Sequence, residues 1–193
     1  MTTKGYFDRF AKHLSDKLSE AGRPRATMRR SLAFAPGSWP AAFPYIEPFV
    51  AGAKPWTRKV AYLVAGLYTT AQAGSGQGNV GNAAARLSAR TDSTSVETRF
   101  IVLLDADEEQ LPHRLRQMVT LMASHDIAPD WATLCRDLVD WRREDRRVQQ
   151  SWAQEYYLRE ARSISVPDTK TSPVDTNTSS NEDSANSAET KEA

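Results

Sequence analysis

Cysteine is nearly absent from this chain, with Cys135 alone among 193 residues. This scarcity excludes an internal disulfide and any zinc site built from several cysteines. The three histidines, His13, His113 and His125, do not have the spacing of paired metal ligands. The sequence therefore predicts no metal centre and no cofactor.

Long apolar runs are missing as well, and none approaches the length needed to span a membrane. At the N-terminus, charged residues such as Lys4, Asp8 and Arg9 interrupt the sequence too early for a secretory signal peptide. We therefore expect a soluble, cytoplasmic protein with no membrane partner.

Familiar catalytic motifs are missing too. No serine lies in a GxSxG motif, and Cys135 has no identifiable activating base. The glycine-rich segment AGSGQGNVG (73–81) lacks the GxxxxGK[ST] pattern of a phosphate-binding loop, and no predicted strand precedes it. We interpret this segment as a flexible joint between two helical parts.

One acidic cluster, Asp105-Ala106-Asp107-Glu108-Glu109 with His113 nearby, is the sharpest candidate for chemistry. Carboxylates in this arrangement are suited to holding a magnesium ion for phosphodiester cleavage. The structural alternative is that the acids precede a helix whose macrodipole favours negative charge at its N-terminus. Such acids are common at helix starts, and we favour the structural interpretation.

A sustained alternating β pattern is also absent, whereas apolar residues recur at helical spacing along most of the chain. The strongest helical pattern runs from Pro129 to Leu158, with two apolar stripes on either side of a charged corner at 142–147. The stripes consist of Trp131, Leu134, Leu138 and Trp141, and of Val148, Trp152 and Tyr156. We predict an all-α fold in which this helical hairpin is a main anchor of the core.

The chain divides by composition into an N-terminal helical lobe at 1–73, a C-terminal helical bundle at 74–162 and an acidic tail at 163–193. The tail has no aromatic residue and only scattered aliphatic ones, so we expect it to be disordered. From Pro167 onward, six acidic residues face two lysines. The rest of the chain then carries 23 basic and 18 acidic residues. A moderately basic body points weakly to a polyanionic partner.

Basic clusters recur through both halves and are the candidate nucleic-acid contacts. The candidates are Arg29, Arg30, Arg58, Lys59, Arg114, Arg116, Arg142, Arg143, Arg146 and Arg147. Arg25 is expected to point outward beside the first pair. The alternative is a solvated surface on which these side chains pair with acids such as Glu144 and Asp145.

The order of several motifs resembles a known family. The segments LLDAD, LPHRLRQMV, RDLVDW and VQQSWAQEYY follow one another, with the dipeptide DW at Asp130-Trp131 between the second and third. Together, over about Ala26 to Leu158, they resemble the CasB family, the small subunit of type I-E CRISPR surveillance complexes (Cascade).

The resemblance implies two small helical lobes without catalytic activity. Family members lie as a head-to-tail pair in an RNA-guided complex and contact the guide RNA and the opened target DNA (the R-loop) through basic residues. The implied partners are therefore both nucleic acids, the large and backbone Cascade subunits, and a second copy. Arg29-Arg30 and the arginines at 142–147 match basic stretches of the family, whereas Arg58-Lys59 and Arg114/Arg116 match less closely. A purely structural adaptor and a metal-dependent nuclease using Asp105 and Asp107 remain alternatives.

Overall fold

The computed structural model describes residues 3–71, 76–91 and 93–164, and within these ranges every regular element is helical. The predicted all-α class is confirmed. In chain order the elements are α1 (Thr3–Leu18), α2 (Arg23–Ser31), the short 3-10 helix η1 (Pro40–Ala42), α3 (Phe43–Val50), α4 (Pro55–Tyr68), α5 (Val80–Thr91), α6 (Thr94–Leu104), α7 (Leu111–Ala123), α8 (Trp131–Asp140) and α9 (Arg147–Ile164). None of these helices is long and apolar enough to cross a membrane.

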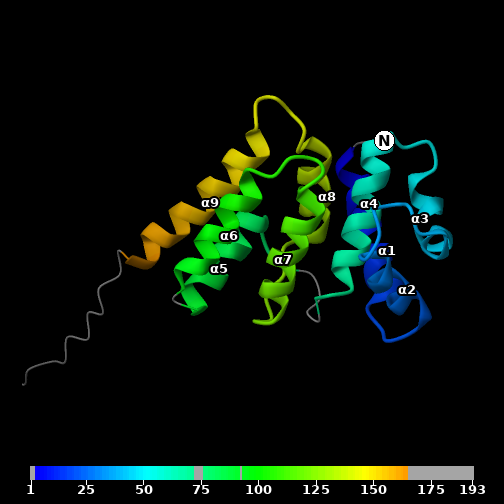
Figure 1. The fold of residues 1–193 in the computed structure, drawn as a ribbon, viewed down its shortest axis with the longest axis horizontal. Coiled ribbons are helices and arrows are strands. Elements are labelled where there is room, and N and C mark those ends of the chain that lie inside the picture. Colours follow the sequence, from blue (N-terminus) through cyan, green and yellow to red (C-terminus); the bar gives the residue numbers. More distant parts are fainter. Residues whose placement is uncertain (1–2, 72–75, 92, 165–193) are drawn as a thin grey trace, which may run out of the picture.

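Helices α1 to α4 gather at one end of the molecule, and α5, α6 and α9 at the other, with α7 and α8 between them (Figure 1). Although it comes late in the chain, α8 packs against α1 and α4, while α9 lies along α5. One continuous cluster of buried apolar side chains connects the two ends. The division of the chain at residues 73 and 74 stays a prediction.

The predicted stripes of the α8–α9 hairpin are buried, as their spacing requires. Trp131 on α8 packs edge-on against Tyr68 of α4, with ring centroids 5.3 Å apart. Tyr156 on α9 stacks on Phe100 of α6 at 4.6 Å and 23°. Buried aromatic rings supply large apolar areas, so this hairpin ties the N-terminal helices to the C-terminal ones.

Helix α9 approaches α5 closely at Gly81. A Cβ atom at that position would overlap the backbone carbonyl of Trp152, so any larger residue would push the two helices apart. The absence of a side chain at Gly81 therefore allows the close packing of α5 and α9.

Two helix ends bear on the organisation of the chain. Ser93 is the N-cap of α6, and its hydroxyl accepts a hydrogen bond from the Ser95 backbone N–H. Helix α9 continues to Ile164, so it includes the first two residues of the predicted tail. The rest of the tail, 165–193, and residues 73–75 of the glycine-rich joint lie outside the described residues.

Candidate nucleic-acid interface

The elbow between α8 and α9 carries four of the predicted basic residues, and each one has an acidic partner. Arg143 pairs with Asp145 at 2.8 Å, and Arg147 pairs with Asp140. Arg146 donates to the backbone carbonyl of Leu104 at 2.6 Å, with Asp105 at 4.0 Å, and Arg142 lies 3.4 Å from Glu108. All four arginine side chains are about half exposed, so these pairs are screened by water and contribute little stability.

Glu108 brings two of the predicted residues together from distant parts of the chain. It accepts from Lys59 of α4 at 3.0 Å and lies beside Arg142 of the elbow. The Arg142 guanidinium also lies over the Trp56 ring, 5.4 Å from its centroid. The Trp56 indole N–H donates to the Leu138 carbonyl at 2.8 Å, which joins α4 to α8 beneath this cluster.

Arg58 is held differently, inside the N-terminal half. Its guanidinium forms an ion pair with Glu47 of α3, and the Tyr62 hydroxyl donates to the same carboxylate. Burial and the neighbouring Glu47 carboxylate raise the pKa of Tyr62 above its ordinary value, so its hydroxyl keeps its proton. Arg58 therefore packs α4 against α3 rather than projecting freely.

Arg29 and Arg30 are exposed on α2, and no ion pair holds either of them within the described residues. Arg114 on α7 is half-buried and likewise has no ion pair there. Arg116, one turn from the start of α7, donates to the Leu32 carbonyl just after α2 at 3.0 Å. That hydrogen bond uses one of its guanidinium donors and leaves the others toward solvent.

Arg25 was expected to point outward, but it hydrogen-bonds to backbone carbonyls at the C-terminal ends of two helices. Its guanidinium donates to the carbonyls of Leu18 and Ser19 at the C-terminal end of α1, at 2.7 and 3.2 Å. It also donates to those of Thr69 and Ala71 after α4, at 3.0 and 3.1 Å. These carbonyls have no partner within their own helices, so Arg25 is a structural residue.

The acidic cluster forms the turn that precedes α7. Asp107 accepts from the backbone N–H groups of Glu109 and Gln110, at 3.0 and 2.8 Å. Glu108 is engaged with Lys59 and Arg142, and Asp105 is exposed near Arg146. Across the described ranges, no group of three or more histidine, cysteine or acidic side chains is placed to hold a metal ion. The two backbone hydrogen bonds in this turn give Asp107 a structural role.

Cys135 is fully buried on α8, and burial raises the pKa of its thiol well above the ordinary value. A thiol in this environment keeps its proton and is a poor nucleophile.

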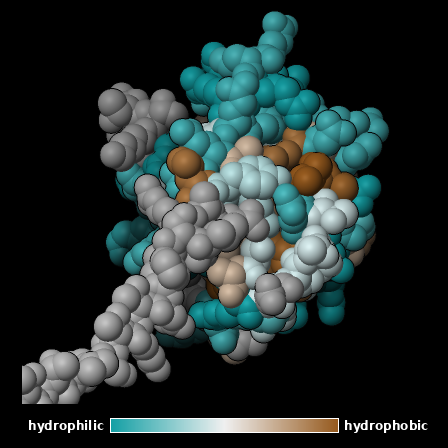
Figure 2. Space-filling model, turned by 90° about the vertical axis from the view of Figure 1, so that its left-hand side faces the viewer, coloured by the Kyte–Doolittle hydropathy of each residue, from teal (hydrophilic) through white to brown (hydrophobic). Residues whose placement is uncertain are grey.

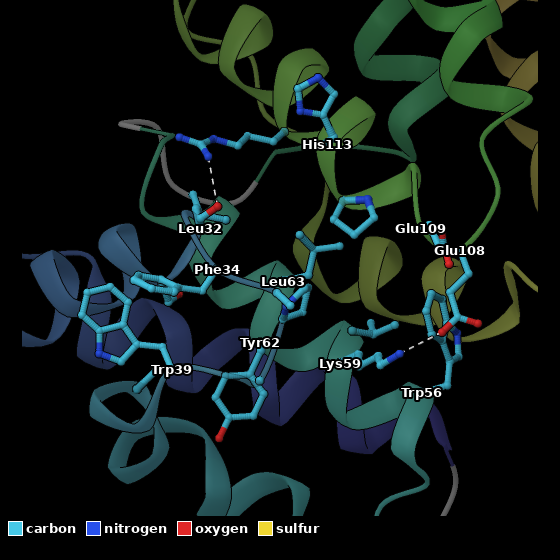
Figure 3. Close-up of a pocket in the computed structure, with 18 residues that line it drawn as sticks. Leu32, Phe34, Trp39, Trp56, Lys59, Tyr62, Leu63, Glu108, Glu109 and His113 are labelled. Carbon is cyan, nitrogen blue, oxygen red and sulfur yellow. Dashed lines mark hydrogen bonds and ion pairs between the residues drawn. The ribbon is translucent and has the colours of Figure 1, made fainter.

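A cavity of about 690 Å³ lies between the N-terminal helices and α7, and nothing in the sequence pointed to it. Phe34 and Trp39 lie at one end, and Trp56, Lys59 and Glu108 lie at the other (Figure 3). Trp39 is partly exposed. The opposite end of the molecule, formed by α5, α6 and α9, is mostly hydrophilic with small hydrophobic patches (Figure 2). Its exposed large apolar side chains include those of Ile101 and Leu158.

Comparison with known proteins identifies the fold. The sequence pattern of the family described as CRISPR-associated protein Cse2 matches residues 24–157. A CRISPR-associated protein Cse2 of Thermus thermophilus is 45% identical over 138 residues, which are 69% of this chain and 78% of that protein.

Solved structures agree with the sequence match. The crystal structure of CasB from M. ruber is similar with a TM-score of 0.71 and 37% identity, covering 83% of this chain and 98% of that one. A chain of a CRISPR RNA-guided surveillance complex has the same fold, with a TM-score of 0.74 and 22% identity over 84% of this chain and 98% of that one. With α1 to α9 arranged as in these proteins and the family pattern extending from α2 into α9, the chain belongs to the Cse2 family of CRISPR-associated proteins.

Proposed function

We propose that this protein is a non-catalytic small subunit of a CRISPR RNA-guided surveillance complex, in which it binds the backbones of guide RNA and target DNA. Membership of the Cse2 family supports this assignment, as does the shared fold with a chain of such a complex. Its partners are then the large and backbone subunits, a second copy of itself, and both nucleic acids.

The observation that carries the nucleic-acid part of the proposal is the pair Arg29 and Arg30. Both guanidinium groups are exposed on one short helix, and the described residues offer neither of them an acidic partner. Unpaired guanidinium groups bind phosphates without a competing protein carboxylate, and such contacts do not depend on base sequence.

Modest backbone contacts are sufficient for such a role. Opening a target duplex exchanges one base-paired duplex for another of similar stability, so a few phosphate contacts shift the balance toward the opened state. Arg114 and Arg116 add to the α2 pair in this proposal. Lys59, Arg58 and the elbow arginines contribute to the extent that phosphates displace the carboxylates that now pair with them.

The test uses the whole complex bound to matched duplex targets at several salt concentrations. Replacing Arg29 and Arg30 together by alanine should weaken binding equally for all target sequences. It should also flatten the logarithmic salt dependence by about 0.7 for each phosphate of single-stranded DNA that the variant no longer binds. A matched control is Lys12→Ala with Lys17→Ala, which removes the same charge from exposed positions on α1. An unchanged slope in the Arg29/Arg30 variant would overturn the proposal.

A structural adaptor is the second candidate, and one observation favours it. Each of the four elbow arginines already has an acidic side chain within 4.0 Å. If the remaining basic residues pair in the same way with acidic surfaces of neighbouring subunits, the arginine variants should impair assembly on the guide RNA. Their salt dependence of target binding should then be unaltered.

A further inference from the structure

Two adjoining hollows meet on the surface of α7 and share His113 and Arg116. The first is the 690 Å³ cavity that runs past Phe34 and Trp39 (Figure 3). The second, of about 500 Å³, is lined by Arg99 of α6 and by polar residues of α7. Because they share two lining residues, the hollows adjoin on α7, and we consider them together as one groove with an aromatic half and a basic half.

Phe34 and Trp39 form the aromatic half. Phe34 is 50% exposed although it is a large apolar residue, and its ring meets the Trp39 ring edge to face at 4.3 Å and 78°. The loop that carries both rings is held in place. The Phe34 N–H donates to the Ser31 carbonyl at 3.0 Å, and Gly37 turns the chain at a φ of 83° against the Tyr62 ring. The Phe34 ring is therefore fixed in position beside Trp39, and about half of its surface is open to solvent.

The basic half contains no acidic side chain among its lining residues. Arg99 is exposed and has no ion pair in the described part of the chain, and Arg116 has unused donors beside its bond to Leu32. Gln117, Thr120 and Ser124 add amide and hydroxyl groups along the same face. Two guanidinium groups with neighbouring hydroxyls are suited to the phosphates and sugars of a nucleic-acid backbone.

The carboxylates of the groove lie at the other end of the cavity, where Glu108 is paired with Lys59 and Arg142, and Glu109 also lines the wall. The phosphate backbone of a nucleic acid in this groove would therefore lie on the Arg99–Arg116 side, with its bases directed toward Phe34. Bases inside a duplex are stacked on one another and cannot reach such a ring, whereas bases of a single strand can.

We propose that this groove binds single-stranded nucleic acid, with phosphates on Arg99 and Arg116 and one unstacked base on the exposed face of Phe34. The proposal takes its ligand class from the proposed function and adds a site and a mode of contact. Stacking is tolerant of base identity, so the groove holds an opened strand without reading its sequence.

Three substitutions of Phe34 test the mode of contact in the assembled complex. Stacking needs an aromatic face, so Phe34→Tyr should bind target DNA as the parent does. Phe34→Ala and Phe34→Leu should both reduce the affinity by about tenfold. If a partner protein's apolar side chain fills the cavity instead, Leu should substitute well for Phe, and Phe34→Ala should impair assembly. That result would overturn the proposal. Phe34 is half-exposed, and a melting temperature for each variant confirms that folding is unchanged.

An abasic scan of the opened target strand supplies the second measurement. In the parent complex, an abasic site at one position should lower the affinity for target DNA by the same factor as the Phe34→Ala substitution does. In the Phe34→Ala complex the same abasic position should cost nothing further. If the abasic position reduced the affinity equally in both complexes, or if no position reduced it, there would be no base-binding site at Phe34. If Arg29→Ala with Arg30→Ala still weakens binding and flattens its salt dependence, the proposed function stands without this groove.

Discussion

Trp152 of α9 donates its indole N–H to the Asp137 carboxylate of α8 at 2.7 Å. Asp137 is partly buried where α8 meets α9, and burial raises the pKa of its carboxyl from 3.8 to about 6, although the bond from Trp152 and the charge of Arg136 act in the opposite direction. The acceptor of this hydrogen bond between α8 and α9 is therefore a carboxylate whose charged form is destabilised by burial.

This relationship predicts how stability depends on pH. The folded state binds the Asp137 proton more tightly than the unfolded state, so this group makes the protein less stable as pH rises from about 4 to 6. Asp137→Asn keeps an oxygen acceptor for Trp152 and removes the buried charge. We expect it to raise stability at pH 7 by on the order of 1–3 kcal/mol and to reduce the pH dependence.

Urea unfolding followed by tryptophan fluorescence at pH 4, 5, 6 and 7 measures this effect. Asp16→Asn is the control, because it removes one acidic charge from an exposed position on α1. A drop in stability for Asp137→Asn at pH 7 would mean that the charged hydrogen bond to Trp152 outweighs the cost of burial.

Arg25 provides the second prediction. Its guanidinium serves four carbonyls at the converging ends of α1 and α4. Arg25→Lys keeps the positive charge but lacks the planar fork, so several carbonyls are left without their partner. We expect the free energy of unfolding to fall by about 2 kcal/mol. The salt dependence of target binding by the assembled complex should stay the same, since the charge is retained. A flatter slope would instead place Arg25 in contact with nucleic acid.

The difference between Arg25 and Trp141 shows what the sequence could and could not predict. Trp141 belongs to a stripe with helical spacing, so a local pattern was sufficient to predict its burial. Arg25 became structural because the ends of α1 and α4, more than forty residues apart, meet beside it. A contact between segments so far apart in the sequence leaves no periodic pattern from which it could be predicted.

The partners of the candidate interface residues were likewise not predictable from the sequence, because they come from distant segments. The arginines of the elbow were visible as a charge run, but their partners Glu108 and Asp105 come from the loop before α7. Arg99 and Phe34 were not singled out because each is an isolated residue in its segment, and only the packing of α6, α7 and α2 brings them to one groove.

Trp141 provides the third prediction. It is 4% exposed, it donates its indole N–H to the Ala106 carbonyl at 3.1 Å, and its ring lies 5.0 Å from that of Trp152. Trp141→Ala should cost about 3–5 kcal/mol in unfolding free energy, because it leaves a large cavity and an unpaired carbonyl. Trp141→Phe should cost less, since it fills most of the space. A change below about 1 kcal/mol for the alanine variant, measured by urea unfolding, would contradict this burial.

The last prediction separates the two roles proposed for the elbow. If Arg142 and Arg143 bind phosphates, replacing both by alanine should weaken target binding equally for all sequences. The salt slope should also flatten by about 0.7 for each phosphate of single-stranded DNA that is no longer bound. Assembly on the guide RNA should largely survive, because both side chains are exposed and the buried stripes are untouched.

Glu108→Gln is the complementary variant. It releases Lys59 and Arg142 from their shared carboxylate while keeping the size of the side chain. Phosphate binding by these cations should then become tighter and more dependent on salt, because no protein anion competes for them. The two variants should therefore shift the salt slope of the whole complex in opposite directions. An unchanged slope in both would assign the elbow cations to protein carboxylates, and failed assembly in either would place the elbow at a subunit interface.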